Sequence, residues 1–277
     1  MNNLKMFCLT LEPSHHKFIK RLGYIPVGLG DKNFKNDSEW LTDKSGLSIS
    51  KKNRNYGEYT FHYWLWKNYI DNTNVTDGWF GFCQYRKFWS NKENNIKPNN
   101  INELLPLVLK KIPNEYENFD VILGDPYFIN QYKIMKFLKK GFKLIIRNPL
   151  YLFNKKKRNL KFHFDLMHGY NNLTKAIALL DENNKKDFTN YVNLNNSFNP
   201  HNMFICKSKK LLKDYYTTLF PWLERCEDLF GFENLTGFDK VRIYGFLAER
   251  FMPYWFNKNA KVKTIPIIFY DIRNDIK

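Results

Sequence analysis

A strand-like apolar run in this sequence ends abruptly in two adjacent cations. The run covers residues 79–84, and Tyr85, Arg86 and Lys87 follow it directly. In an α/β protein the carboxyl ends of the central strands open into the ligand crevice. A guanidinium binds phosphate oxygens in a bidentate way, and an ammonium adds a point charge. Arg86 and Lys87 therefore predict a phosphate-rich ligand, while an edge strand protected from aggregation by cations explains them equally well.

The sequence holds no familiar pattern of metal ligands. His163 and His168 are five residues apart, His15 and His16 are adjacent, and neither spacing presents two imidazoles to one ion. The sequence also lacks an Asp-x-Asp pair, a P-loop, a nucleophile elbow and an H-E-x-x-H motif. If the chain binds a diphosphate, cationic side chains must neutralise it. We therefore expect neither a divalent metal nor another cofactor.

The charge balance of the chain favours an anionic partner. Its 277 residues include 44 Lys and Arg against 27 Asp and Glu, a formal net charge of +17. Nucleic acid, an anionic membrane face and phosphorylated small molecules all fit this excess. A merely soluble basic surface is the alternative.

The cysteines and the apolar runs bear on the compartment. The 4 Cys form no C-x-x-C pair, which indicates buried thiols in a reducing compartment. No signal-peptide pattern opens the sequence, and no apolar run approaches the ~20 residues of a membrane span. We expect a cytoplasmic protein that can associate with a membrane surface.

Strand and helix patterns alternate along the chain, which favours an α/β fold with a central, mostly parallel sheet flanked by helices. Asn55 and Glu58 have the spacing of a capping box. Ser208 is expected to cap a long helix that Pro221 kinks, and residues 31–57 are expected to form a long loop. The predicted strands cover 5–10, 24–27, 79–84, 119–124, 203–206 and 265–270, and the predicted helices cover 58–69, 101–111, 171–181, 209–227 and 239–251, the last ending before Pro253.

Residues 132–161 differ from the rest of the chain. This segment holds many Lys and Arg residues and no acid, and bulky apolar residues are interleaved with them. Such a mixture is what an interfacial membrane-binding segment needs. Each cation near an anionic surface contributes about 1 kcal/mol, so the segment could hold the protein reversibly on a membrane. A solvated basic insertion is the alternative.

Four sequence blocks occur in an order that resembles one bacterial family, over residues 43–250. That family is found in capsule and O-antigen gene clusters and was long known only as a domain of unknown function; its members are regarded as glycosyltransferases with a GT-A-like fold. Two positions differ, because Gln84 stands where the family usually has His and Gly57 where it commonly has Cys. The blocks are Asp43–Gly46 with Ile49–Asn53, Tyr56–Thr60 and Tyr63–Asn68; Gly81–Phe88; Asn202–Ile205; and Arg242 with Gly245–Arg250.

The resemblance implies a single GT-A-like glycosyltransferase domain over residues 1–277. Such an enzyme would transfer a sugar from a nucleotide-sugar donor to a lipid-linked glycan acceptor in capsule or O-antigen synthesis. It would work at the inner face of the plasma membrane, where the basic insertion at about 132–161 would meet the anionic membrane surface. Under this interpretation no nucleic acid is expected as a partner.

The resemblance also directs attention to donor-binding residues. Asn53 and Glu58 lie at a predicted loop-to-helix junction, where a carboxylate can accept from ribose hydroxyls; a capping role for Glu58 fits equally well. Arg86, with Lys87, would stabilise the departing phosphate oxygens. Tyr85 would pack on the base or the sugar, or would fill the core.

Further polar residues precede the predicted strand at 203–206 or lie on the last predicted helix. Asn199, His201 and Asn202 could hydrogen-bond sugar hydroxyls, and a satisfied structural histidine is the alternative for His201. Arg242 and Arg250 complete the expected donor-binding set.

An inverting transferase needs a carboxylate that deprotonates the acceptor hydroxyl. Glu249 is the first candidate, and Asp239 and Asp125 follow it. Asp239, Arg242 and Glu249 fall on one face of the predicted helix. An ion pair of Glu249 with Arg242 or Arg250 that positions this helix is the alternative for Glu249, and an N-cap is the alternative for Asp239.

Two other classes of function fit parts of the sequence. Aromatic side chains in a basic groove would bind single-stranded RNA or DNA, although the aromatics here mostly fall on the core faces of helices and strands. A catalytically inactive scaffold of the polysaccharide machinery is the third possibility.

Overall fold

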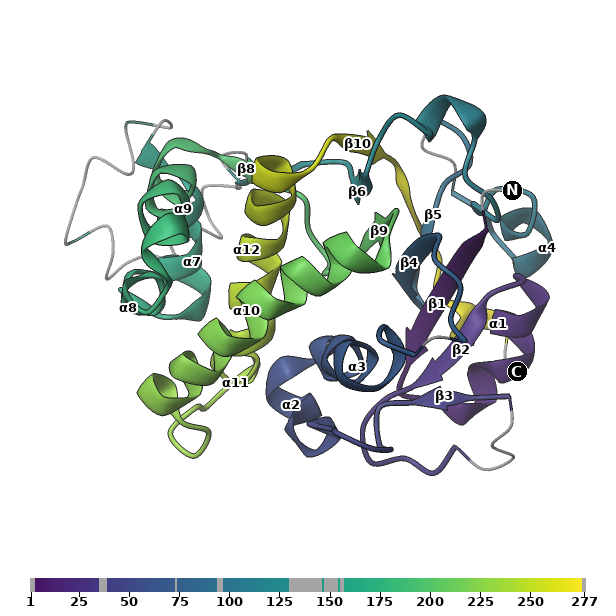
Figure 1. Ribbon diagram of the computed structural model, residues 1–277, viewed down its shortest axis with the longest axis horizontal. Helices are drawn as coiled ribbons and strands as arrows, with labels where there is room; N and C mark the ends of the chain where they lie inside the picture. Colours follow the sequence, from purple (N-terminus) through teal and green to yellow (C-terminus); the bar gives the residue numbers. More distant parts are fainter. Residues whose placement is uncertain are drawn as a thin grey trace. The chain divides into compact units, whose positions relative to one another are not determined.

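The computed structural model describes residues 3–34, 39–72, 74–93, 97–129 and 157–275, together with positions 146 and 154. The chain divides into two compact units, and Figure 1 labels many of their helices and strands. The expected assignment of residues 1–277 to one glycosyltransferase domain stays a prediction, and the basic insertion predicted at about 132–161 lies mostly outside the described residues. Unit 1 comprises Met1–Asp125, His201–Thr217 and Phe256–Lys277, and unit 2 comprises Pro126–Pro200 and Thr218–Trp255.

Unit 1 is built on a mixed, mostly parallel sheet. Along its main path only β9 runs antiparallel, between β4 and β6, while β5 and β11 form an antiparallel pair beside β4. The predicted α/β fold with a central sheet flanked by helices is confirmed. The strand order is β10 (Val262–Ile265), β6 (Val121–Gly124), β9 (Phe204–Cys206), β4 (Trp79–Gln84), β1 (Leu4–Thr10), β2 (Ile25–Gly28) and β3 (Leu41–Thr42), with β5 (Lys87–Trp89) and β11 (Ile267–Phe269) off this path.

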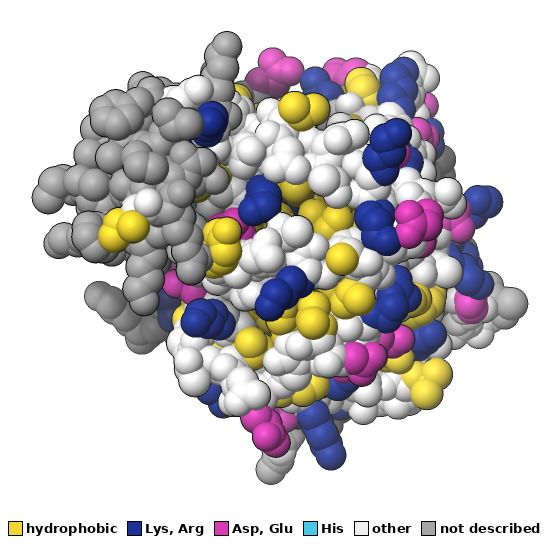
Figure 2. Space-filling view, turned by 90° about the vertical axis from the view of Figure 1, so that its left-hand side faces the viewer, with side chains coloured by type: hydrophobic (Ala, Val, Ile, Leu, Met, Phe, Trp, Pro, Cys, Tyr) yellow, Lys and Arg dark blue, Asp and Glu magenta, His cyan; other side chains and the backbone are white. Residues whose placement is uncertain are grey.

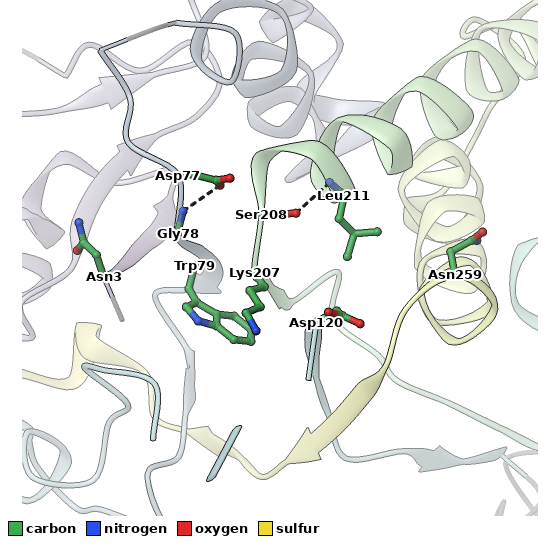
Figure 3. Close-up of a pocket in the computed structure, with 9 residues that line it drawn as sticks. All are labelled: Asn3, Asp77, Gly78, Trp79, Asp120, Lys207, Ser208, Leu211 and Asn259. Atoms are coloured by element: carbon green, nitrogen blue, oxygen red, sulfur yellow. Dashed lines mark hydrogen bonds between the residues drawn. The ribbon is translucent and has the colours of Figure 1, made fainter. Parts of the chain in front are cut away.

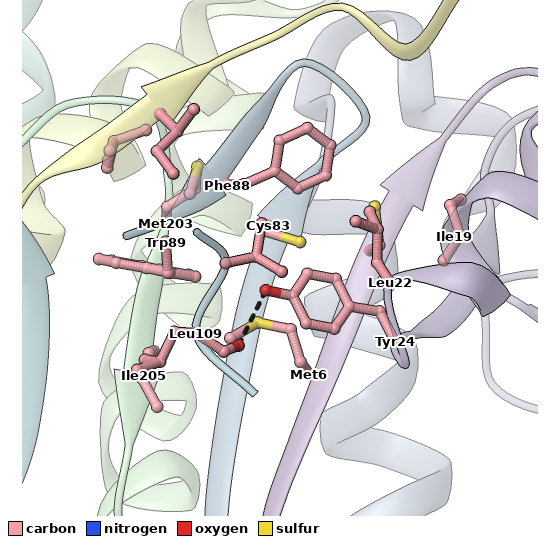
Figure 4. Close-up of a cluster of buried hydrophobic side chains, with 14 of the residues drawn as sticks. Met6, Ile19, Leu22, Tyr24, Cys83, Phe88, Trp89, Leu109, Met203 and Ile205 are labelled. Atoms are coloured by element: carbon pink, nitrogen blue, oxygen red, sulfur yellow. Dashed lines mark hydrogen bonds between the residues drawn. The ribbon is translucent and has the colours of Figure 1, made fainter. Parts of the chain in front are cut away.

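Alternate side chains of β1 pack on the two faces of the sheet. Met6 and Cys8 belong to the buried cluster shown in Figure 4, together with Ile19 of α1 (His16–Arg21). The Tyr24 hydroxyl lies inside this cluster and donates to the carbonyl of Leu109 at 2.8 Å. This bond satisfies a polar group that would otherwise be costly to bury.

On the other face, Phe7 of β1 packs on aromatic rings. It stacks on Phe82 with centroids 5.6 Å apart and contacts Phe61 of α3 (Tyr59–Trp64) at 5.4 Å. The Nδ1 atom of His62 in α3 and the Tyr216 hydroxyl form a hydrogen bond of 2.6 Å. Because both faces are covered, the central strands are continuous apolar runs, which is the pattern that made them recognisable in the sequence.

Helices and turns of unit 1 begin and end differently from the sequence expectations. The capping box expected from Asn55 and Glu58 is wrong, because Asn55 lies inside α2 and the Glu58 side chain makes no capping bond at the start of α3. Ser208 caps α10 (Lys209–Phe230) as expected, accepting from Leu211 N at 3.2 Å. The elements are α1 (His16–Arg21), α2 (Asn53–Tyr56), α3 (Tyr59–Trp64) with a π-helical turn (Leu65–Tyr69), α4 (Ile101–Leu104), and short 3₁₀ turns at Pro13–His15, Ser50–Lys52, Asn114–Tyr116 and Ile272–Asp275.

Prolines account for two boundary errors in unit 1. The helix expected over 101–111 stops at Leu104 because Pro106 has no N–H to donate to the carbonyl of Asn102 and so cannot continue the helical ladder. Pro266 likewise divides the strand expected over 265–270 into β10 and β11, since proline has no N–H to continue the ladder. Residues 31–57 also contain β3 and α2 rather than loop alone.

Unit 2 is mainly helical. Two of its helices, α7 and α9, were not predicted, although each has an N-cap: Asn159 accepts from Phe162 N, and Asp181 accepts from Asn184 N. Its elements are β7 (Tyr127–Phe128) paired with β8 (Ser197–Phe198), α7 (Leu160–His168), α8 (Asn172–Ala178), α9 (Glu182–Leu194) and α11 (Phe238–Val241). The long helices α10 (Lys209–Phe230) and α12 (Ile243–Asn259) each have residues in both units.

The helix expected over 239–251 is two helices. The break lies at Arg242, whose φ of −92° and ψ of 24° end α11. The N-cap of α11 is Gly237, so the N-cap expected at Asp239 is wrong; Asp239 lies in the first turn. Pro253 lies inside α12 rather than beyond its end, because residues on nearly all sides of this helix are buried and packing holds it together.

Candidate active site

The topology brings several predicted site residues to one edge of the sheet of unit 1. β1, β2, β4 and β6 run parallel, so their carboxyl ends share this edge. Asp125 follows the end of β6 and is exposed. β9 runs the other way, so His201 and Asn202, which precede it, reach the same edge. Crevices for ligands form at such an edge.

Gln84, the last residue of β4, is the centre of a hydrogen-bonded cluster. Its Nε2 donates to Glu58 Oε1 at 3.0 Å and to the carbonyl of His201 at 2.9 Å. Its Oε1 accepts from Lys87 Nζ at 3.2 Å. One amide thus fixes a carboxylate, an ammonium and a loop, which are three of the groups singled out in the sequence. We name Glu58, Gln84, Lys87 and His201 the Gln84 cluster.

The backbone at His201 and Asn202 adopts a conformation that L side chains rarely enter. Their φ angles are +82° and +54°. Residues held in this region commonly lie at ligand-binding sites, where the surrounding structure keeps them in place. Here the bond from Gln84 to the His201 carbonyl supplies part of that constraint.

Arg86 belongs to a second cluster, around Tyr85. The Arg86 guanidinium lies 4.9 Å from the centre of the Tyr85 ring, and the Arg273 guanidinium lies 5.5 Å from it. His15 packs on the same ring at 4.8 Å. Asp271 accepts from Arg273 Nε at 2.9 Å, and this bond, with the nearby charge of Arg86, lowers the pKa of Asp271. The structure thus gives Arg86 and Lys87 different neighbours, although they are adjacent in sequence.

A third group of polar residues lies at the ends of β2 and β3. A side chain added to Gly30, which has a φ of +70°, would meet Asn53 Oδ1 at 3.5 Å. Asn53 Nδ2 donates to the Gly57 carbonyl and to Thr60 Oγ1, at 2.9 and 3.0 Å. Asp43 is fully buried after β3, and this burial raises its pKa to about 6, while Thr60 lowers that pKa in part. Asn53 therefore connects the loop with α3 and lies close to the glycine turn at Gly30.

Glu249, Arg250 and their neighbours lie in unit 2 and are considered within it. Arg250 is only 2% exposed, and its Nη1 donates to Glu249 Oε2 at 2.5 Å. Its Nη2 lies 3.2 Å from His163 Nδ1, and its guanidinium covers the Phe198 ring at 3.7 Å. The ion pair anticipated between Glu249 and Arg250 is present.

Asp239 and Arg242 precede Glu249 in the sequence and also belong to unit 2. The Asp239 carbonyl lies 2.9 Å from His168 Nδ1, and burial lowers the pKa of His168 to about 4, helped by the charge of Arg250. The Arg242 guanidinium lies 5.4 Å from the centre of the exposed Phe238 ring. The expected common face of Asp239, Arg242 and Glu249 is interrupted by the break between α11 and α12.

A hollow of about 550 Å³ opens at the opposite edge of the sheet, where β1 and β4 begin (Figure 3). Asp77 in its wall accepts from the backbone N–H groups of Gly78 and Lys209, each at 2.9 Å. Asp120 accepts from Lys261 N at 2.9 Å. These carboxylates close turns and start a helix, so we assign them a structural role.

Three features of the described residues bear on metal binding, membrane spanning and the distribution of positive charge. Within the described ranges, no three His, Cys, Asp or Glu side chains gather closely enough to hold a metal ion. None of the helices that the structure describes is long and apolar enough to cross a bilayer. On the face shown in Figure 2, the described Lys and Arg side chains are scattered among hydrophobic ones rather than joined in one stripe.

Sequence reasoning missed two residues of these clusters. Gln84 was noted only for replacing a histidine, yet it makes three hydrogen bonds to predicted site residues. Arg273 stands near the end of the chain, and no motif connects it with Tyr85. Gln84 could have been recognised as a polar residue at the end of an apolar strand. No local sequence pattern marks Arg273 as a site residue.

Comparisons with known proteins identify a family and a fold. A family model described as "Domain of unknown function (DUF4422)" matches residues 9–260. The solved structure of the WbbM bifunctional glycosyltransferase, in its apo form, superposes with a TM-score of 0.72 at 22% identity, covering 97% of this chain and 45% of that one. The chain thus spans less than half of the WbbM chain.

Other comparisons add little. Core-mannan synthase A of Aspergillus fumigatus, in a form with Mn and GDP, gives a TM-score of 0.34 at 11% identity, covering 95% of this chain and 73% of that one, and we draw nothing from it. No curated protein matches the chain.

Proposed function

The chain belongs to the DUF4422 family, and on that premise we propose that it is a glycosyltransferase acting in cell-surface polysaccharide synthesis, with a nucleotide-sugar donor and a lipid-linked glycan acceptor. The observation that carries the proposal is the gathering of two guanidiniums, an ammonium, a carboxylate and an amide at the edge of one mixed sheet where its parallel strands end. The fold that the chain shares with WbbM supports it.

In this proposal the diphosphate of the donor binds beside Tyr85. Arg86 and Arg273 are both exposed there, and each offers a planar set of N–H donors that suits phosphate oxygens. Negative charge grows on the leaving diphosphate as its bond to the sugar breaks, and fixed cations stabilise that charge. We include metal independence in the proposal because the sequence has no Asp-x-Asp pair.

The nucleoside and the sugar would bind on the two sides of the diphosphate. We propose that Asn53 contacts the ribose from the start of the helical region and that Glu58 accepts from a hydroxyl of the donor. His201 and Asn202 would contact hydroxyls of the sugar. Lys87 would contribute its charge through the Gln84 cluster, where its ammonium is held by Gln84 Oε1.

For the proton transfer we propose Glu249 as the general base, with Asp239 and Asp125 as alternatives. The Glu249 carboxylate, which is paired with Arg250, would accept the proton of an acceptor hydroxyl. Arg242 and Arg250 remain members of the proposed donor-binding set. A role of Arg250 in positioning Glu249 agrees with its burial.

The proposed acceptor is attached to a lipid, so the enzyme must reach a membrane surface. We propose that it is a peripheral protein at the inner face of the plasma membrane. The basic segment 132–161 would bind anionic lipids, with about 1 kcal/mol from each cation near the surface. Co-sedimentation with phosphatidylglycerol vesicles that weakens as salt is added would support this part.

A thermal-shift screen against UDP-, GDP-, CMP- and dTDP-sugars, with and without EDTA, tests the central proposal. We expect one donor class to raise the melting temperature equally in both conditions, and mass spectrometry to detect slow release of its free nucleotide. Stabilisation that EDTA abolishes would contradict metal independence. Tight, salt-sensitive binding of oligonucleotides without any effect of nucleotide sugars would instead favour the nucleic-acid alternative.

A further inference from the structure

An exposed aromatic ring stands beside the Gln84 cluster. Phe269, the last residue of β11, is 60% exposed although its neighbours Ile267 and Ile268 are buried. Its strand pairs with β5 so that Phe269 lies directly opposite Lys87. The His201 ring meets the Phe269 ring edge to face, with centroids 5.4 Å apart. A large apolar side chain is therefore kept in water next to several polar groups.

These surroundings have the composition of a small-ligand site. Such sites combine an apolar or aromatic wall with a few polar groups in fixed positions. Here Gln84 holds the polar groups, because it is bonded to Glu58, Lys87 and the His201 carbonyl. The left-handed backbone at His201 adds an observed constraint of the kind found where ligands bind.

The chemistry of the groups points to a sugar ring. Hydroxyl groups both donate and accept hydrogen bonds, and the cluster offers an acceptor in Glu58 and a donor in Lys87. One face of a pyranose consists largely of C–H bonds, and the negative face of an aromatic ring attracts these weakly positive hydrogens. Phe269 can supply that ring while the polar groups bind the hydroxyls at the rim.

We propose that Phe269 and the Gln84 cluster form a pyranose-binding subsite. Phe269 packs on the C–H face of the ring, Glu58 accepts from a hydroxyl, and Lys87 donates to another. This inference deepens the proposed function and rests on it for the source of the sugar. The pyranose belongs either to the nucleotide-sugar donor or to the glycan acceptor.

The test replaces Phe269 with Ala and with Trp. Saturation-transfer NMR with the methyl glycosides of glucose, galactose, mannose and N-acetylglucosamine reports contact with the free sugar. Titration calorimetry compares UDP-glucose, UDP-galactose and GDP-mannose with UDP and GDP. Leu47→Ala is the matched control, since Leu47 is 62% exposed in the same unit and lies outside the cluster.

We expect Phe269→Ala to weaken sugar binding about three- to tenfold, the range of a lost aromatic contact, and Phe269→Trp to retain it. An effect on the nucleotide sugar but not on its free nucleotide would identify the donor sugar. An effect on the methyl glycosides alone would identify the acceptor. Because Phe269 is exposed, the variants should keep the melting temperature of the parent.

Two binding results would overturn the subsite. One is unchanged binding of every sugar probe by Phe269→Ala. The other is an equal loss of affinity for UDP or GDP, which would mean that Phe269 stacks on a base. Sugar binding that depends on Phe269 in a protein without any transfer or donor hydrolysis would leave the subsite standing and refute the transferase. Full transfer activity of Phe269→Ala would refute the subsite and leave the proposed transferase function standing.

Discussion

Gln84 Nε2 lies 3.0 Å from Glu58 Oε1, so the last residue of β4 is bonded to the residue that directly precedes α3. The same nitrogen donates to the His201 carbonyl, and the amide oxygen accepts from Lys87. A single side chain thus connects β4 and the turn after it with two segments that are far away in the sequence.

Gln84→Ala should impair the donor site more than the fold. Losing the amide frees Glu58 and Lys87 to move, and the stability cost should be roughly 1 kcal/mol because these groups are half-buried rather than fully buried. We expect a higher KM for the donor and a small fall in melting temperature. Gln84→Glu should be worse, since it puts a second negative charge against Glu58. Equal activity of the parent and both variants would remove Gln84 from the site.

Arg86→Ala and Arg273→Ala should each reduce transfer about 100-fold or more, the usual cost of removing a group that stabilises charge in the transition state. Lysine at either position should restore part of the activity, because it keeps the charge but not the bidentate geometry. Arg21→Ala is the control, an exposed arginine of the same unit. Steady-state kinetics with the donor found in the screen measure the effect. Retention of full activity in both alanine variants would refute the assignment of the diphosphate.

Asp43 should make the protein less stable as the pH rises from about 4 to 6. Burial raises its folded-state pKa from 3.8 to about 6, so in this window the folded state binds more protons than the unfolded state. Asp43→Asn removes the buried charge and should stabilise the protein at pH 7.5 by up to about 3 kcal/mol, but not at pH 3.5. Urea unfolding at both pH values is the measurement. A stabilisation that is equal at both would mean that Asp43 is solvated in the folded state.

Glu249→Gln and Arg250→Lys separate catalysis from positioning. Glu249→Gln should lower kcat about 100- to 10,000-fold if Glu249 is the base, and the acidic limb of the pH–rate profile should disappear. Arg250→Lys keeps a charge in a buried place but loses contacts, so it should destabilise the protein and lower kcat less. If Glu249→Gln changes only the melting temperature, the ion pair is structural and Asp239 and Asp125 become the carboxylates to test.

The sequence by itself determined the fold class and the main strands. β1, β4 and β9 are continuous apolar runs because both faces of the sheet are covered, and that pattern is local and legible. The sequence also marked Arg86, Glu58 and His201 as candidate site residues, since each stands next to the end of a predicted helix or strand. The predicted helix ends were less accurate at two prolines. Pro106 ends α4 by a local rule, because proline has no N–H for the helical ladder, whereas packing keeps Pro253 inside α12 despite that rule.

Only the tertiary structure decided which of these residues act together. Arg86 and Lys87 are neighbours in sequence, yet Lys87 is bonded to Gln84 while Arg86 lies with Arg273 around Tyr85. The reason is physical: a hydrogen bond or a ring contact depends on distance in space, and the pairing of β4 with β5 and of β5 with β11 brings distant segments within a few ångströms. The chemical type of each side chain can be read from the sequence, whereas the pairing of the strands decides which side chains contact one another.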